Sequence, residues 1–260
     1  MSERKENKNH KSDEEVHARL TTNTTFADET LLFENLYPER RGNVRKRNWL
    51  KTAFGLEGKE NLEKIKCERN TYWCLRNSPL VKILLAALNS SGCKFDFRRH
   101  ISCETCYGKV SGGYDSELNQ VVICQNVAKR KSTVQGVLTH ELIHMFDYCQ
   151  NKLDLQDINH LACSEIRAAN LAHCSFLSAW IYRNASPFNI KKKHKECVRQ
   201  KALSSVLSIK NISKAEALQI IDLVFQKCYF DLEPIGRRCR RNSIDMNLAF
   251  LEAPLYGYDY

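Results

Sequence analysis

Glycine, proline and long apolar segments are scarce in this sequence, and each scarcity excludes a class of protein. Only 10 of the 260 residues are glycine and 5 are proline, which excludes collagen-like and low-complexity architectures. The longest apolar run, Leu80–Leu88, is interrupted by Lys82 and is far shorter than the ~18 residues of a membrane-spanning helix. Residues 1–20 lack the apolar core of a secretory signal and are too acidic for a typical transit peptide. We therefore expect a soluble or peripheral protein that does not span a membrane.

Cysteine and positive charge, in contrast, are abundant. The hydrophobic share of 43% and the charged share of 27% are those of an ordinary globular protein. Lys and Arg total 40 against 30 Asp and Glu, and the resulting net charge of +10 suggests an anionic partner surface, either phospholipid or nucleic acid. The 12 cysteines are too many for a reducing cytosol unless they bind metal or carry redox chemistry.

The chain divides into three parts by composition. Residues 1–55 are polar and basic, and we expect a mostly disordered, flexible arm there. Residues 56–235 carry helical and strand patterns typical of one folded domain, and residues 236–260 form a C-terminal tail that is basic and then aromatic.

Helix-start signals place most of the domain's secondary structure. Ser78 with Pro79 predicts a helix over residues 80–90, and a β-like stretch with a strand at Val121–Ile123 follows it. Capping signals then predict helices that begin near Ser132 (with Gln135), Asp157 and Ser213 (with Glu216), and a further helix lies around residues 192–207. The expected fold is α+β and mainly helical, with a small antiparallel β-sheet beside the helix that begins at Ser132. One edge strand of this sheet is a candidate for binding an extended substrate.

The sequence HELIH, His140 to His144, is the strongest functional motif. On a helix, positions i and i+4 share one face, so both imidazoles can reach one metal ion. Glu141 lies one position round the helix, beside the metal, where it can take a proton from the attacking water. We therefore predict a zincin-like metallopeptidase with one catalytic Zn²⁺, which acidifies water and polarises the scissile carbonyl.

A catalytic zinc site needs a third protein ligand. The metzincin pattern requires Gly at 147 and His at 150, and the sequence has Asp147 and Gln150 there, so that class is excluded. Glu165 follows His144 by 21 residues, on the next predicted helix, which is the gluzincin spacing. The structural alternative for Glu165 is a salt bridge to nearby Arg167. His160 competes as a third ligand. Asp147 is a weaker candidate, and we expect it instead to hydrogen-bond a ligating imidazole.

The cysteines leave two interpretations open. Four of them, which include a C-x-x-C pair, could form a structural zinc site: Cys93, Cys103, Cys106 and Cys124. Alternatively, all 12 could pair as disulfides. Their even spread from Cys67 to Cys239, across helices as well as the β-like stretch, favours a disulfide-rich protein.

Three basic clusters stand apart from the metal motif. Each is ordinary solvated surface by itself, but together they allow electrostatic docking on an anionic membrane: residues 129–131, 191–193 and 237–241. The same charges would permit nucleic-acid binding. No helix-turn-helix, zinc-finger or RNA-recognition pattern supports that partner, so we expect no specific nucleic acid.

Longer segments carry a family resemblance. From about Cys67 to Pro234 the chain contains SCETCYGKVSGGYD, VVICQN, GVLTHELIHMFDYC and INHLACSEIRAANLAHCS. In these it resembles the family of mitochondrial inner-membrane-associated metalloproteases that mature and assemble ATP synthase, whose metal and catalytic positions match His140, Glu141 and His144 one by one.

The resemblance implies a zinc metalloendopeptidase on the intermembrane-space side of the mitochondrial inner membrane, peripherally attached to it. It further implies that the partner is the F0 proton-channel subunit of ATP synthase, which the family processes in fungi and helps to join to the c-ring. Cysteines oxidised by the intermembrane-space disulfide relay would follow. The competing hypotheses are a non-proteolytic assembly chaperone and a nuclear, DNA-associated metalloprotease. The intact Glu141 argues against the first, and oxidised cysteines would argue against the second.

Overall fold

The computed structural model describes residues 59–107, 110–151, 153–176, 186–239 and 243–259. Every described residue belongs to one compact unit, which lies within residues 47–260. The arm expected over residues 1–55 lies outside the described residues, so it stays a prediction. None of the described helices is long and apolar enough to cross a membrane.

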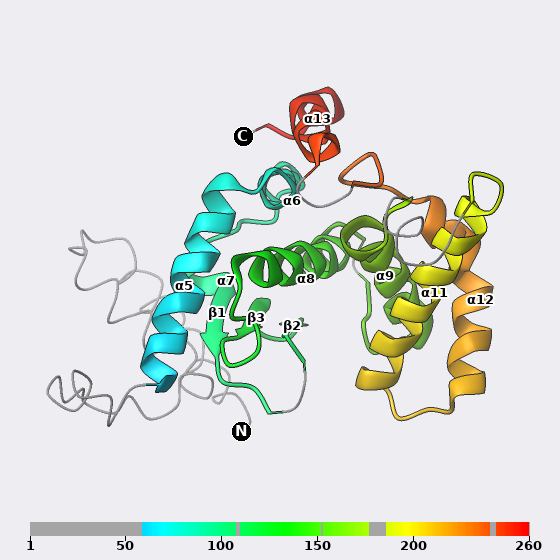
Figure 1. Ribbon diagram of the computed structural model, residues 1–260, viewed down its shortest axis with the longest axis horizontal. Helices are drawn as coiled ribbons and strands as arrows, with labels where there is room; N and C mark the ends of the chain where they lie inside the picture. Colours follow the sequence, from blue (N-terminus) through cyan, green and yellow to red (C-terminus); the bar gives the residue numbers. More distant parts are fainter. Residues whose placement is uncertain (1–58, 108–109, 152, 177–185, 240–242, 260) are drawn as a thin grey trace, which may run out of the picture. The chain divides into compact units, whose positions relative to one another are not determined.

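The described chain is mostly helical, as predicted (Figure 1). A π-helical turn, η1 (Ala169–His173), follows helix α9 (Ile158–Ala168) directly, and a 3₁₀ turn, η2 (Ala253–Tyr256), follows helix α13 (Ile244–Glu252). In chain order the elements are α5 (Lys59–Asn77), α6 (Pro79–Ser90), α7 (Phe97–His100), β1 (Ile101–Glu104), β2 (Gly112–Asp115), β3 (Gln120–Cys124), α8 (Lys131–Asn151), α9 (Ile158–Ala168), η1 (Ala169–His173), α11 (Ile190–Ile209), α12 (Lys214–Phe230), α13 (Ile244–Glu252) and η2 (Ala253–Tyr256).

Two of the three predicted side-chain caps form. Asp157 accepts a hydrogen bond from the Asn159 amide at the start of α9, and Ser213 accepts one from the Glu216 amide at the start of α12. The capping box expected at Ser132 is wrong, because α8 begins at Lys131. The Gln135 side chain instead donates to Ser78 Oγ, which lies at the N-cap of α6, and so links two packed helices.

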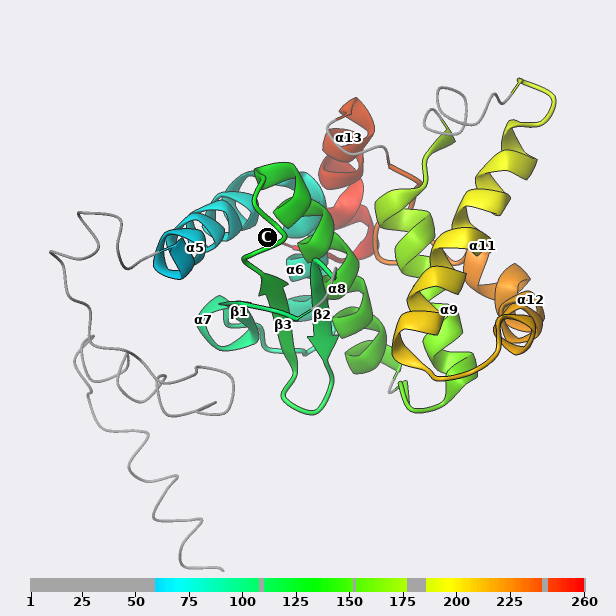
Figure 2. The ribbon, with the colours of Figure 1, turned by 60° about the horizontal axis from the view of Figure 1, so that its bottom comes forward.

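The small sheet is mixed, not antiparallel as expected. The strand order is β1-β3-β2, with β2 antiparallel and β1 parallel to β3 (Figure 2). The chain reverses direction between β1 and β2 and again between β2 and β3, so β1 and β3 run the same way. Because β3 inserts between the other two strands, the two strands of equal direction become neighbours. This order leaves β2 as an edge strand beside α8.

Two hydrophobic clusters make up the described core. The first joins α5, α6, the sheet, α8 and α13, and the second joins α9, α11 and α12. Helix α8 is buried over most of its length because it packs on α5, α6, the sheet and α9. The metal motif therefore sits on a central helix that the rest of the fold holds in place.

Ten of the 12 cysteines form disulfides. Three bonds lie in the α5–α8 part and two in the α9–α12 part: Cys67–Cys103, Cys93–Cys149, Cys106–Cys124, Cys163–Cys228 and Cys174–Cys197. The disulfide prediction is therefore confirmed. The four-cysteine zinc site is wrong, because all four of those cysteines form disulfides: Cys106 with Cys124, Cys93 with Cys149 and Cys103 with Cys67. The alternative in which all 12 pair does not hold, since Cys74 and Cys239 are free and buried.

Gly112 allows β2 to approach α8, which yields a first prediction. A Cβ atom at Gly112 would lie 2.4 Å from Val137 Cγ1 and 2.6 Å from the Val122 carbonyl oxygen, whereas one at Gly113 would meet nothing within 4 Å. We expect Gly112→Ala to lower the free energy of unfolding by about 1–3 kcal/mol through overpacking, and Gly113→Ala to change it little. Thermal unfolding of both variants measures this; equal midpoints would contradict the close approach.

Candidate active site

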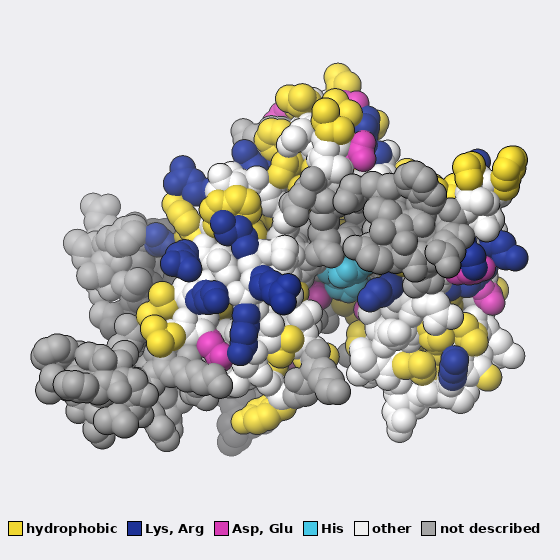
Figure 3. Space-filling view, viewed as in Figure 1, with side chains coloured by type: hydrophobic (Ala, Val, Ile, Leu, Met, Phe, Trp, Pro, Cys, Tyr) yellow, Lys and Arg dark blue, Asp and Glu magenta, His cyan; other side chains and the backbone are white. Residues whose placement is uncertain are grey.

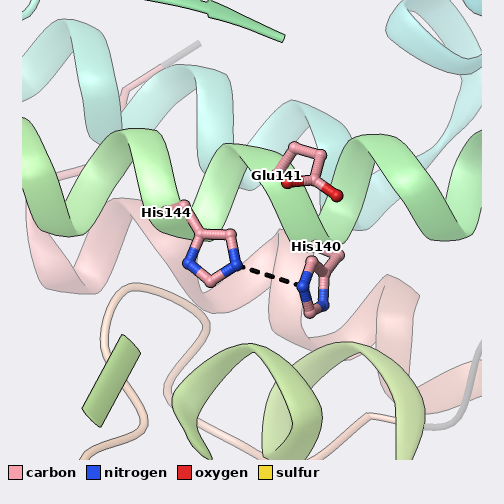
Figure 4. A group of neighbouring side chains, drawn as sticks. All are labelled: His140, Glu141 and His144. Atoms are coloured by element: carbon pink, nitrogen blue, oxygen red, sulfur yellow. Dashed lines mark hydrogen bonds between the residues drawn. The ribbon is translucent and has the colours of Figure 1, made fainter. Parts of the chain in front are cut away.

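Helix α8 brings His140 and His144 together as the motif predicts. Their Nε2 atoms lie 3.1 Å apart, and Figure 4 shows the two rings side by side along α8, with Glu141 at the next position round the helix. One ligand atom from each of the three residues lies within 4.8 Å of the others. The spacing of a single helix therefore assembles two imidazoles and one carboxylate.

Glu165 of α9 reaches the same point from the other side of the cleft. Its Oε2 lies 3.4 Å from His140 Nε2, and its Oε1 lies 3.5 Å from His144 Nε2. The side chain is 3% exposed, and within the described part of the chain its Oε2 makes no hydrogen bond. A buried carboxylate whose two oxygens each face one imidazole nitrogen fits a cation ligand.

The other two candidates occupy different places. His160 accepts a hydrogen bond from the Asp154 backbone amide at 3.3 Å and is not among the residues that line the active-site cavity. Asp147 does not reach the imidazole directly, because Ser164 stands between them: Ser164 Oγ donates to Asp147 Oδ2 at 2.7 Å and lies 2.7 Å from His144 Nδ1. The structure thus brings Glu165 to the imidazoles, and it connects Asp147 to His144 through a hydroxyl.

Ser164 determines which nitrogen of His144 faces the site. A hydroxyl has one hydrogen, and Ser164 gives it to Asp147, so His144 Nδ1–H must donate to Ser164 Oγ. His144 Nε2 then carries a lone pair where His140 and Glu165 converge, as a metal ligand requires. Sequence reasoning missed Ser164, although it lies directly before Glu165.

A buried arginine holds the Asp147 side chain of this hydrogen-bond chain in place. Arg167 forms an ion pair with Asp147 at 2.9 Å, pairs with Asp231, and donates to the Glu233 carbonyl at 2.6 Å. The salt bridge considered between Arg167 and Glu165 is therefore replaced by pairs with two aspartates. Burial raises the pKa of Asp147 to about 6, although Arg167 and Ser164 act to lower it.

His173 is a second residue that sequence reasoning missed. It ends the π-helical turn η1, and its Nε2 lies 3.0 Å from His140 Nδ1. With Nδ1 of His140 engaged there, Nε2 of His140 is left to face His144 and Glu165. The available signal was its position eight residues after Glu165, about two helical turns further along the same segment.

The three histidines His140, His144 and His173 and the glutamates Glu141 and Glu165 line a cavity of about 940 Å³. It lies between β2 and α8 on one side and α9, η1 and α11 on the other. The edge strand contributes Gly112, Gly113 and Tyr114, and the Tyr114 backbone hydrogen-bonds to the Glu141 carboxylate. Because β2 pairs with β3 on one side only, its other edge is available to an extended peptide. The edge strand expected from the sequence therefore lies at the cavity.

Comparison with known proteins decides the family. The model of the Peptidase M76 family matches residues 65–236, two thirds of the chain. The chain belongs to the Peptidase M76 family. This confirms the resemblance and the prediction of a metallopeptidase. No solved structure matches the chain.

Relatives of known name match this chain over most of their own length. The chain is 42% identical to the Mitochondrial inner membrane protease ATP23 homolog of Danio rerio over 205 aligned residues. The aligned part covers 78% of this chain and 77% of that protein. The chain is 45% identical over 174 residues to the Homo sapiens homolog, covering 66% and 70%. The Mitochondrial inner membrane protease ATP23 of Saccharomyces cerevisiae is 36% identical over 179 residues, covering 66% and 78%.

The electrostatics of this M76 site favour a positive charge where the ligand groups meet. Burial lowers the pKa of His144 to about 4, so that imidazole is neutral, as a metal ligand must be. Burial would also lower the pKa of His140, but the Glu141 and Glu165 carboxylates raise it to about 9. Burial would raise the pKa of Glu165, yet the two histidines hold it at about 2. At neutral pH the Glu165 carboxylate is therefore ionised, His144 is neutral, and His140 holds a proton that a bound cation would displace.

Glu141 has a different environment from Glu165. Burial raises its pKa to about 7, and the Tyr114 backbone and His140 oppose that shift. A carboxylate that titrates near neutral pH can both accept and return a proton under working conditions. The two glutamates of the site thus differ in the way expected of a ligand and a general base.

Proposed function

We propose that this M76 peptidase is a zinc metalloendopeptidase of the mitochondrial inner membrane, on the intermembrane-space side, that acts in maturation and assembly of the ATP synthase F0 sector. The observation that carries the proposal is the convergence of His140 Nε2, His144 Nε2 and the Glu165 carboxylate on one point. Two nitrogens and one carboxylate are a ligand set of catalytic zinc, which keeps a fourth position open. The active-site helix beside an edge strand supports a zincin-like fold.

In this proposal His140, His144 and Glu165 hold the zinc ion. A bound zinc ion supplies Lewis-acid catalysis and makes water more acidic. The outer edge of β2 aligns the peptide across the cavity, and Glu141 accepts the proton of the attacking water and returns it to the leaving amine. Ser164 and Asp147 hold His144 in the ligating tautomer, and His173 does the same for His140.

The partner and the location follow from the relatives and the cysteines together. The relatives are named as mitochondrial inner membrane proteases, and five disulfides suit an oxidising compartment outside the reducing cytosol and nucleus. In this proposal the protein associates peripherally with the anionic inner membrane and acts on the F0 proton-channel subunit. A purely chaperoning role would not require the buried Glu141 at the metal motif, and a nuclear role would not suit the disulfides.

Metal analysis tests the site. We expect one zinc ion per wild-type chain, and a loss of zinc and of peptide hydrolysis in a His140→Ala, His144→Ala double variant and in Glu165→Ala. His160→Ala is the matched control, since that imidazole lies off the cavity, and it should keep its zinc. Full zinc in the double variant, or its loss in His160→Ala, would refute the ligand set. Incubation with the F0 proton-channel subunit precursor, analysed by N-terminal sequencing, tests the substrate.

A further inference from the structure

The outward face of α5 carries apolar and basic side chains in one continuous stripe. Its apolar members are between 39% and 61% exposed. The seven residues recur every three or four positions and, at 100° per residue, cover about one third of the helix circumference: Leu62, Ile65, Lys66, Arg69, Tyr72, Trp73 and Arg76. Four are apolar or aromatic, three are basic, and none is acidic.

The opposite face of α5 is fixed to the fold. Cys67 forms a disulfide with Cys103 of β1, and Asn70, Thr71 and Cys74 are buried. Helix α5 packs on α8 and α6 through this face. The stripe is therefore presented outward by a helix that cannot rotate about its axis.

The start of α8 adds charge beside the stripe. Lys131 Nζ lies 4.0 Å from the centre of the Trp73 ring, and Arg76 donates to Tyr72 Oη at 2.8 Å. The acidic neighbour Glu63 is paired with Lys129 at 3.0 Å. Figure 3 shows Lys and Arg side chains gathered over α5 and the start of α8, with hydrophobic side chains between them. We call the seven stripe residues together with Arg130 and Lys131 the α5 surface.

We propose that the α5 surface docks on an anionic phospholipid bilayer. This rests on the proposed membrane association and assigns it to particular residues. Tyr72 and Trp73 have the amphipathic rings that lie at headgroup level in membrane interfaces, and the basic side chains extend beside them towards lipid phosphates. Leu62 and Ile65 supply the apolar contact with the acyl boundary that an in-plane helix requires.

Charge and apolar contact together distinguish lipid from the alternatives. A nucleic acid would use the basic side chains but would leave Leu62 and Ile65 without an apolar partner. Helix α13 also exposes apolar side chains, Ile244 and Leu251, each 72% exposed, but its charged residues are acidic. Helix α12 also exposes Leu223 and Phe230 on the face that carries Lys227, but that face has this one basic residue, whereas three basic residues lie in the α5 stripe.

The α5 surface ends beside residues that line the active-site cavity. Lys131 directly precedes Ser132 and Thr133, which line that cavity. Val110 and Ser111, which directly precede strand β2, line it as well. Docking through α5 would therefore hold this side of the cavity near the bilayer surface. The natural substrates of the peptidase would then be polypeptide segments that emerge from the membrane.

Vesicle binding of the full chain tests the charges. The probes are phosphatidylcholine vesicles with roughly one fifth phosphatidylserine, and pure phosphatidylcholine as the neutral comparison. Each basic residue at an anionic surface contributes about fivefold, so we expect Lys66→Gln with Arg69→Gln to weaken binding about 25-fold. The matched control is Lys214→Gln with Lys227→Gln, the same charge change on exposed residues of α12 outside the three basic clusters, and it should bind like the wild type.

A second pair of variants tests the apolar contact. Leu62→Gln should weaken binding about tenfold, whereas Leu223→Gln, at a residue that is 78% exposed on α12, should leave it unchanged. Circular dichroism and hydrolysis of a short soluble peptide, expected to be unchanged in all four variants, verify the fold.

Three results would overturn the docking surface: wild-type protein that ignores anionic vesicles, controls that lose as much binding as the α5 variants, or tighter α5-dependent binding to a DNA duplex. Hydrolysis of soluble peptide without vesicle binding would refute docking and leave the peptidase intact. Vesicle binding without hydrolysis would refute the peptidase and leave docking intact.

Discussion

Glu141→Gln is expected to lower kcat for peptide hydrolysis about 10²–10⁴-fold while the metal stays bound. Glutamine has the shape of glutamate but cannot accept the proton of the attacking water. Because burial already raises the pKa of Glu141 to about 7, a neutral amide at this buried position should not destabilise the fold. Initial rates on a soluble peptide, metal content and thermal unfolding of the variant measure the three effects.

Glu117→Gln is the matched control, since it makes the same chemical change at an exposed residue outside the cavity. It should retain wild-type kcat and metal content. Undiminished cleavage by Glu141→Gln would remove Glu141 from the mechanism. Loss of metal from that variant would instead make Glu141 a ligand, and the roles of Glu141 and Glu165 would have to be exchanged.

Reduction of the five disulfides is expected to unfold the protein. The bonds close loops of 18 to 65 residues, each worth about 3–4 kcal/mol in the chain-entropy model. Their combined contribution reaches or exceeds the ~5–15 kcal/mol by which a domain is usually stable. Circular dichroism during thermal unfolding, with and without a reductant, should show a cooperative transition in the oxidised protein and none in the reduced one.

Alkylation followed by intact mass measurement gives the matching thiol count. In denaturant without a reductant we expect two modified cysteines, Cys74 and Cys239, and all 12 after reduction. In the native protein both free thiols should react slowly, because they are buried and burial raises the pKa of Cys74 to about 11 and that of Cys239 to about 12. Twelve modified cysteines before reduction would contradict the disulfide framework.

Local sequence determined the half of the site that lies on one helix. His140 and His144 meet because an i, i+4 pair shares a helix face wherever that helix is placed. The side-chain caps at Asp157 and Ser213 formed for the same reason, since each involves residues two or three positions apart. At Ser132 the local rule failed, because Gln135 found a partner 57 residues away, on Ser78.

Only the tertiary structure decided what lies opposite those histidines. His160 and Glu165 are five residues apart on α9, so about 140° of rotation separates them, and only one can face α8. The packing of α9 on α8 and α12 made that choice, and it also placed Ser164 against His144 and His173 against His140. The disulfide partners and the parallel pairing of β1 with β3 were likewise settled by contacts between residues distant in the chain, which no local periodicity encodes.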